Sequence, residues 1–70
     1  MKLTELQMKQ IESNISIFAI NSSATEEQRH LVYTIYNSLT GQQKKPNSCG
    51  RCWRNVKTTV YQNYLKQKEQ

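Results

Sequence analysis

Residues 49–64, CGRCWRNVKTTVYQNY, carry the clearest helical periodicity in the chain. At about 100° per residue, six of their side chains fall within one arc of about 120°. These six are Cys49, Cys52, Trp53, Val56, Val60 and Tyr64. The pattern predicts an amphipathic helix over residues 49–67, capped by Ser48. A loop at 41–48 precedes it, since Gly41 favours a helix end and Pro46 keeps the residue before it out of helical geometry.

Two further helices are predicted upstream of this segment, at about residues 4–19 and 26–40. Each begins with a capping box, formed by Thr4 with Gln7 and by Thr25 with Gln28. The apolar face of the first is predicted to hold Leu3, Leu6, Ile11, Ile15 and Phe18. The stripe of the second is predicted to hold Leu31, Val32, Ile35 and Leu39. The expected fold class is therefore all-α, a small three-helix domain.

The length of the chain predicts a single domain that gains stability from a partner surface. Seventy residues bury only about 60% of the surface that the unfolded chain exposes. The hydrophobic fraction is low, at 36%, so a homo-oligomer or a larger protein assembly is a reasonable expectation. No signal peptide and no apolar run approaching about 20 residues is visible, which predicts no membrane partner. We therefore expect an intracellular, cytoplasmic protein with reduced cysteines.

The charge is divided unevenly along the chain. Residues 1–28 hold two lysines against four glutamates, a net charge of −2, whereas residues 29–70 hold eight basic residues against one glutamate, a net charge of +7. A basic half favours contact with phosphate groups or with an acidic protein surface. It is also a common means of keeping a small domain soluble.

Five of the basic residues surround the predicted start of the third helix. They are Lys44, Lys45, Arg51, Arg54 and Lys57. The N-terminus of a helix presents free backbone N–H groups and a positive dipole, so a phosphate can bind there. The leading hypothesis is a non-enzymatic, basic binding module that contacts nucleic-acid phosphate through residues 44–57. A helix-turn-helix is disfavoured, since the loop is longer than the 3–4-residue turn of that motif, so contact with the backbone is expected rather than base recognition.

A second face of the same helix supports an alternative hypothesis. Tyr61, Leu65 and Lys68 lie near one another away from the Trp53 arc, and exposed apolar groups ringed by cations are typical of a contact surface. The chain would then be a structural or interaction protein that docks on other protein subunits. Packing under a chain terminus is the simpler explanation of the same pattern.

The two cysteines allow three interpretations. Cys49 and Cys52 are small buried hydrophobes in the simplest one. Zinc needs four ligands, and His30 lies on the polar side of its helix, so a dimer would have to pool two CxxC pairs or ligands would have to come from elsewhere. Thiol–disulfide chemistry is the third, since a helix N-terminus with nearby arginines stabilises a thiolate, and an i, i+3 pair can meet disulfide geometry. With no Asp and one His, no enzyme and no cofactor is predicted, zinc being the alternative.

The C-terminal 30 residues carry a pattern of their own: Gly41…Lys45-Pro46-x-Ser48-Cys49-Gly50-x-Cys52-Trp53…Val56…Val60-Tyr61…Tyr64. This pattern resembles small proteins encoded by tailed bacteriophages. The resemblance implies a virion-associated or DNA-packaging accessory role, with the virion as a second location. It also implies an oligomer or a larger assembly, and it carries no site residues with it.

Overall fold

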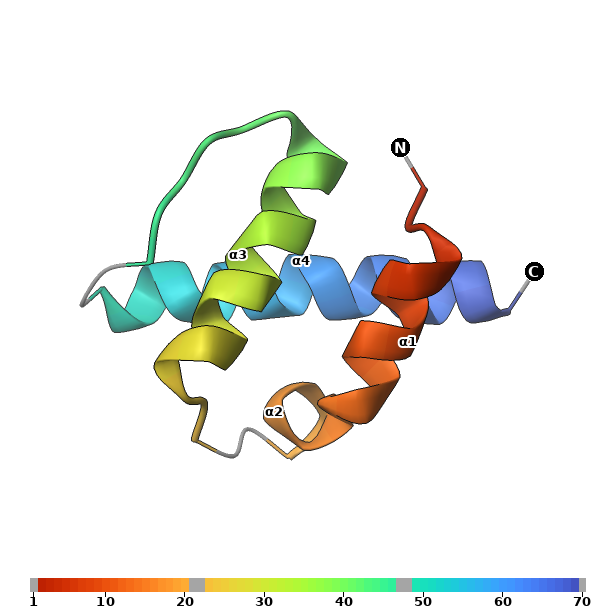
Figure 1. Cartoon of the computed structure of the whole chain (residues 1–70), viewed down its shortest axis with the longest axis horizontal. Coiled ribbons are helices and arrows are strands. Elements are labelled where there is room, and N and C mark those ends of the chain that lie inside the picture. Colours follow the sequence, from red (N-terminus) through yellow and green to blue (C-terminus); the bar gives the residue numbers. More distant parts are fainter. Residues whose placement is uncertain (1, 21–22, 47–48, 70) are drawn as a thin grey trace.

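Four α-helices make up the protein, as described by a computed structural model that covers residues 2–20, 23–46 and 49–69 (Figure 1). In chain order they are α1 (Glu5–Ser13), α2 (Ile15–Ala19), α3 (Glu26–Thr40) and α4 (Gly50–Lys68). No strand occurs within the described ranges. The predicted all-α class is confirmed, and the three predicted segments correspond to the four helices because the first is divided.

α4 is the central helix of the fold, and the other three helices pack against it (Figure 1). Its buried side chains are Val56, Val60 and Tyr64, with Val60 fully buried. These three positions belong to the arc predicted from the sequence, so the periodicity identified the core face of this helix. Within the described residues, no helix combines the length and the apolar character needed to cross a membrane.

The first predicted helix is interrupted at Asn14, which the sequence analysis did not foresee. Asn14 has φ −119° and ψ 28°, outside helical geometry, and separates α1 from α2. The interruption changes which side chains face inward: Ile17 is buried, whereas Ile15 is 38% exposed. Leu6 is also exposed, so the prediction that Leu6 and Ile15 belong to the core face was wrong. Leu3, Ile11 and Phe18 are buried as predicted.

Asn14 is held at this junction by two hydrogen bonds. Its Nδ2 donates to the Gln10 carbonyl at 2.8 Å, and its Oδ1 accepts from Nε2 of Gln28 at 2.9 Å. The same Gln28 side chain accepts from the Thr25 N–H at 2.8 Å, while the Gln28 N–H donates to Thr25 Oγ1 at 3.2 Å. The capping box of α3 therefore also fixes the corner between α1 and α2.

The buried face of α3 is wider and more aromatic than the predicted stripe. Val32 and Ile35 are buried as predicted, but Leu31 and Leu39 are only half-buried. Tyr33 and Tyr36 take up the remaining core positions, at 3% and 8% exposure. Aromatic rings bury more area than leucine and can lie flat against a neighbouring helix, which explains why they displace the leucines from the centre of the face.

Gly41 ends α3 and directs the chain back toward α4. It adopts the left-handed conformation, with φ 73°, and its N–H donates to the Asn37 carbonyl at 2.8 Å. The Asn37 side chain then pairs with both backbone groups of Lys44, at 2.9 and 3.0 Å. The predicted cap of α4, Ser48, lies outside the described residues. The N-cap is Cys49, whose Sγ accepts from the Cys52 N–H at 3.1 Å.

The two ends of the chain are joined by polar contacts. The Leu3 N–H donates to Oε1 of Gln67 at 2.8 Å, and Nε2 of Gln67 donates to the Leu3 carbonyl at 2.7 Å. The Tyr64 hydroxyl donates to Oε1 of Glu12 at 3.0 Å. These bonds fix α1 on the C-terminal half of α4 and leave the N-terminal half of α4 to α3.

Replacing Asn14 with Ala tests the corner between α1 and α2. Asn14→Ala removes both side-chain hydrogen bonds and should lower the free energy of unfolding by about 1–2 kcal/mol. Urea denaturation followed by circular dichroism measures the change. Ser13→Ala, at the neighbouring exposed position, should change stability by less than about 0.5 kcal/mol. Equal effects of the two substitutions would contradict the assigned role of Asn14.

Candidate functional site

Trp53 stands at the centre of the site, where the N-terminal half of α4 meets α3. Its indole is half-buried and stacks on the Tyr33 ring, with centroids 6.0 Å apart and an angle of 13° between the planes. Tyr33 is itself buried on α3, so the stack joins the two helices. The position of the indole is therefore fixed by core packing.

Two cations lie over the indole. The guanidinium carbon of Arg29 is 5.8 Å from the ring centroid of Trp53, and Nζ of Lys57 is 5.4 Å from it. The negative face of an indole attracts cations at this range. Arg29 is the fourth residue of α3 and Lys57 the eighth residue of α4. The ring thus draws positive charges from two helices toward one point.

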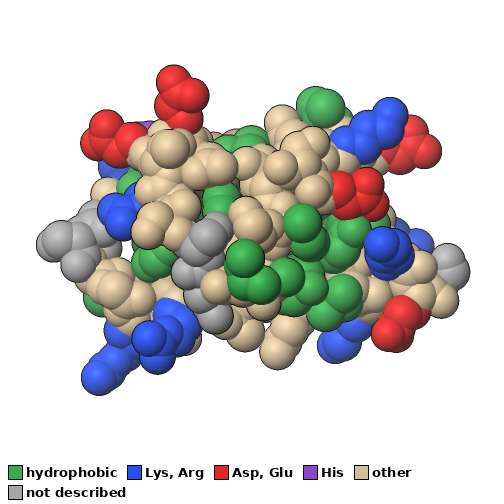
Figure 2. Space-filling model, turned by 90° about the horizontal axis from the view of Figure 1, so that it is seen from below, with side chains coloured by type: hydrophobic (Ala, Val, Ile, Leu, Met, Phe, Trp, Pro, Cys, Tyr) green, Lys and Arg blue, Asp and Glu red, His purple; other side chains and the backbone are tan. Residues whose placement is uncertain are grey.

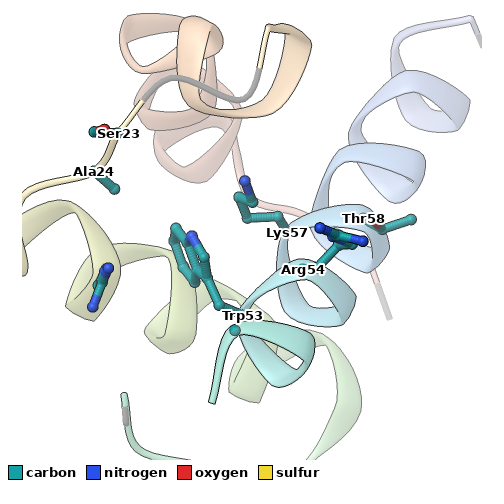
Figure 3. Close-up of a pocket in the computed structure, with 8 residues that line it drawn as sticks. Ser23, Ala24, Trp53, Arg54, Lys57 and Thr58 are labelled. Atoms are coloured by element: carbon teal, nitrogen blue, oxygen red, sulfur yellow. The ribbon is translucent and has the colours of Figure 1, made fainter. Parts of the chain in front are cut away.

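A surface pocket of about 670 Å³ opens beside this cluster. Its lining residues are Ser23, Ala24, Arg29, Gly50, Trp53, Arg54, Lys57 and Thr58. Figure 3 shows Trp53 and Lys57 projecting from α4 toward the segment of Ser23 and Ala24, with Arg54 beside Thr58. Three of the lining side chains are cationic and none of those described is acidic. The lining also includes Gly50, the first residue of α4.

The environment of Lys57 disfavours its charged form. Partial burial lowers the pKa of Lys57 from its ordinary value of 10.5, and the nearby Arg54 guanidinium lowers it further. Both effects disfavour the ammonium form. Since the folded-state pKa lies below the unfolded one, the unfolded chain binds more protons between the two values, and stability rises with pH across that window. An anion in the pocket would relieve the repulsion.

The structure divides the five cations predicted to form one phosphate site. Arg54 and Lys57 line the pocket, whereas Arg51 is exposed and does not. Lys44 is held beside α3, with Nζ 5.6 Å from the centroid of the Tyr36 ring. Lys45 is exposed on the loop. The prediction joined these five residues because they are close in the sequence. In the structure Lys44 lies beside α3 and not at the pocket.

Arg29 is the cation of the pocket that the sequence analysis missed. It precedes Tyr33 by four positions on α3, so both lie on one side of that helix. That spacing was visible in the sequence. It could not place Arg29 at the pocket, because this placement depends on the tertiary contact between Tyr33 and Trp53.

Cys49 and Cys52 form a disulfide, with Cα atoms 5.3 Å apart. Both residues are half-buried and neither belongs to the core. The structure therefore differs from the expectation of two reduced, buried thiols, because the first turn of α4 extends past α3 and brings the two sulfur atoms together. The alternative that an i, i+3 pair meets disulfide geometry is the one observed. A bridge that closes so short a loop stabilises the fold by only about 2 kcal/mol.

The zinc alternative stays a prediction. Among the described residues, no three or more His, Cys, Asp or Glu side chains gather closely enough to hold a metal ion. His30 is exposed on α3, as its place on the polar side predicted. A zinc site would therefore need reduced thiols and ligands from a second chain.

The predicted partner face is less uniform than the sequence suggested. Tyr61 is half-buried and stacks on Phe18 of α2, with ring centroids 5.8 Å apart. Nζ of Lys68 lies 3.5 Å from the Tyr64 hydroxyl. Leu65 is 41% exposed and lines a groove of about 260 Å³ with Phe18 and Tyr61. Of the three predicted partner residues, Tyr61 belongs partly to the core and Leu65 faces solvent.

Two further exposed apolar side chains lie close to Phe18 in the sequence. Ile15 and the residue after α2, Ile20, are 38% and 72% exposed. Figure 2 shows hydrophobic side chains gathered near the middle of the face seen from below, with basic groups at both sides. Such an apolar area rimmed by charges is a typical contact surface.

Comparison with protein-family models, curated proteins and solved structures finds no match. The function therefore has to be argued from the geometry of the site. The resemblance to small proteins of tailed bacteriophages stays a prediction.

The pKa of Lys57 can be used to test the geometry of the pocket. Arg54→Gln removes a neighbouring positive charge and should raise the pKa of Lys57 toward 10.5. A pH titration of ¹³C-labelled lysines by NMR measures this change directly. Arg51→Gln removes the same charge one turn away, outside the pocket lining, and should leave Lys57 unchanged. Equal changes in the pKa of Lys57 in the two variants would show that Arg54 is no closer to Lys57 than Arg51 is.

Proposed function

We propose that the protein is a non-enzymatic module that binds the phosphate backbone of nucleic acid at the pocket beside Trp53. The observation that carries the proposal is the convergence of Arg29, Arg54 and Lys57 on a pocket whose described lining holds no acid. Guanidinium groups bind phosphate through paired hydrogen bonds, and a lysine adds a point charge. The first residue of α4 at the same pocket adds the positive end of a helix dipole.

A polymeric phosphate suits this surface better than a small anion. The pocket is open at the surface, and two further cations, Lys44 and Lys45, lie outside it on the loop. The chain as a whole carries a net charge of +5, which raises the association rate with a polyanion. A nucleic-acid strand can engage the pocket with one phosphate and the outer cations with its neighbours.

The environment of Trp53 supports binding without base recognition. Tyr33 stacks on the indole, and Arg29 and Lys57 lie over it. A base could stack on Trp53 only by displacing one of these contacts, so the ring is better suited to positioning cations than to holding bases. Contacts of this kind bind phosphates independently of sequence.

Charge reversal at two positions of α4 tests the site. Arg54→Glu should weaken binding of a single-stranded oligonucleotide at least tenfold, because Arg54 lines the pocket. Arg51→Glu changes the net charge equally, yet Arg51 lies outside the lining, so a loss of no more than about threefold is expected. Trp53 fluorescence reports binding, and circular dichroism checks that both variants fold. Equal losses would show that overall charge, rather than the pocket, drives binding.

The salt dependence of the same titration counts the phosphate contacts. Three contacts with a single strand give a log–log slope of about −2, or roughly a 20-fold loss of affinity between 50 and 200 mM salt. Arg54→Glu should make this slope shallower, whereas Arg51→Glu should leave it nearly unchanged. Absence of binding at low salt would refute the proposed function.

The second candidate is a structural or interaction protein, favoured by the exposed apolar side chain of Leu65 at the groove that it lines with Phe18 and Tyr61. Under this hypothesis the positive charge keeps the protein soluble and the groove receives another protein subunit. The resemblance implies that this assembly is a phage particle.

Light scattering distinguishes this candidate. If the groove joins copies of the chain, the protein is an oligomer and Leu65→Ser, a change at an exposed apolar residue of the groove, makes it monomeric. Leu6→Ser, at 65% exposure on α1 and outside the groove, should leave the oligomer intact. A monomeric wild-type protein at all concentrations would rule out self-association through this face.

A further inference from the structure

The disulfide lies at the edge of the proposed phosphate pocket. Cys49 is the N-cap of α4, Gly50 lines the pocket, and Cys52 directly precedes Trp53. The bridge closes a loop with a sequence separation of only 3, so it constrains the unfolded chain little. α4 is held on the core by Val56, Val60 and Tyr64, all of which lie beyond the bridge. The core packing of α4 therefore does not involve the disulfide.

The position of Cys49 favours a thiolate once the bridge is opened. The Cys52 N–H donates to Cys49 Sγ at 3.1 Å, and this bond strengthens when the sulfur is negative. The positive end of the α4 dipole acts on the same atom. Cysteines in such surroundings have stabilised thiolates, and their disulfides are reduced more easily than structural ones.

Charged groups from both helices surround this end of the molecule. α4 contributes Arg51 and Arg54. α3 contributes Glu26, Arg29 and His30, which share a small hollow with Pro46 of the loop. Glu26 opposes a thiolate, but the arginines outnumber it, so the balance of charge favours the negative sulfur.

We propose that Cys49–Cys52 is a reversible thiol–disulfide centre whose reduction weakens phosphate binding at the neighbouring pocket. Its substrates are low-molecular-weight thiols and their disulfides. A thiolate attacks Cys49 Sγ, the bond between the two cysteines breaks, and Cys52 leaves with the electron pair and takes a proton. A second thiolate attacks the bound thiol sulfur, and Cys49 leaves as a thiolate. Two thiols have then become one disulfide, and the protein has gained two electrons.

Reduction changes the charge of the site without changing the fold. A neutral disulfide becomes one thiolate and one thiol, so a negative charge appears at the helix end that contributes Gly50 to the pocket. That charge competes with an incoming phosphate for the same positive groups. At the separation of neighbouring residues, one charge near the surface alters affinity by about threefold at low salt. This part of the proposal rests on the proposed function, whereas the thiol chemistry does not.

The first experiment measures the exchange without nucleic acid. The protein is equilibrated with mixtures of reduced and oxidised glutathione, quenched with acid, alkylated and weighed by mass spectrometry. We expect a reversible change of two thiols as the ratio of the squared concentration of reduced glutathione to the concentration of oxidised glutathione is raised. The unbridged Cys52→Ser variant should be alkylated at Cys49 at a lower pH than glutathione requires. A bridge that resists glutathione, or thiols that never pair, would overturn the proposal.

The second experiment measures oligonucleotide affinity in each redox state. The oxidised protein should bind a single-stranded oligonucleotide about threefold more tightly than the protein reduced with dithiothreitol. The double variant Cys49→Ser, Cys52→Ser has no thiolate, so it should match the oxidised protein and ignore the reductant. Equal affinity of the two wild-type states would refute the coupling. Loss of binding in both states would instead refute the proposed function and leave the exchange result standing.

Discussion

The stacking of Tyr33 on Trp53 is the contact on which the rest of the site depends. It joins α3 to the N-terminal half of α4. Val56 is the first buried side chain of α4, so the stack lies N-terminal to the buried part of that helix. Without this stack, the first turn of α4 would extend beyond the core with little to hold it. The indole therefore serves both as the outer edge of the core and as the floor of a charged pocket.

The concentration of cations around the indole follows from that placement. Arg29 lies on the same side of α3 as Tyr33, and Lys57 follows Trp53 by one turn of α4, so each is brought to the ring by the helix that carries it. The ring offsets part of their repulsion through its negative faces. Partial burial and, to a smaller extent, the nearby Arg54 guanidinium lower the pKa of Lys57. A site under such repulsion gains more from an anion than a dispersed set of surface charges would.

The same helix end combines two kinds of chemistry. Cys49 caps α4 through its sulfur and also forms the disulfide with Cys52. Gly50, which lies between the two cysteines, lines the pocket. Backbone N–H groups and arginines that favour phosphate also favour a thiolate, since both ligands are negative. Competition between them follows from electrostatics alone and requires no movement of the helices.

The sequence alone determined the helical class, the capping boxes of α1 and α3 and the core face of α4. These are local properties: capping boxes at Thr4 and Thr25 act within one turn, and a spacing of 3.6 residues places Val56, Val60 and Tyr64 together. Only Arg54 and Lys57 of the five cations predicted for the phosphate site reached the pocket, because charge clustering along a chain carries no information about where a loop runs.

The tertiary structure decided the remaining features, each through contacts between distant segments. Asn14 interrupts the first helix because Gln28 reaches it from the next one, and this turned Ile15 outward. Tyr33 and Tyr36 replaced the expected leucines because flat rings fit between α3 and its neighbours. Arg29 joined the pocket only because Tyr33 meets Trp53. Helical periodicity specifies a face, whereas the partner of that face depends on packing between segments far apart in the chain.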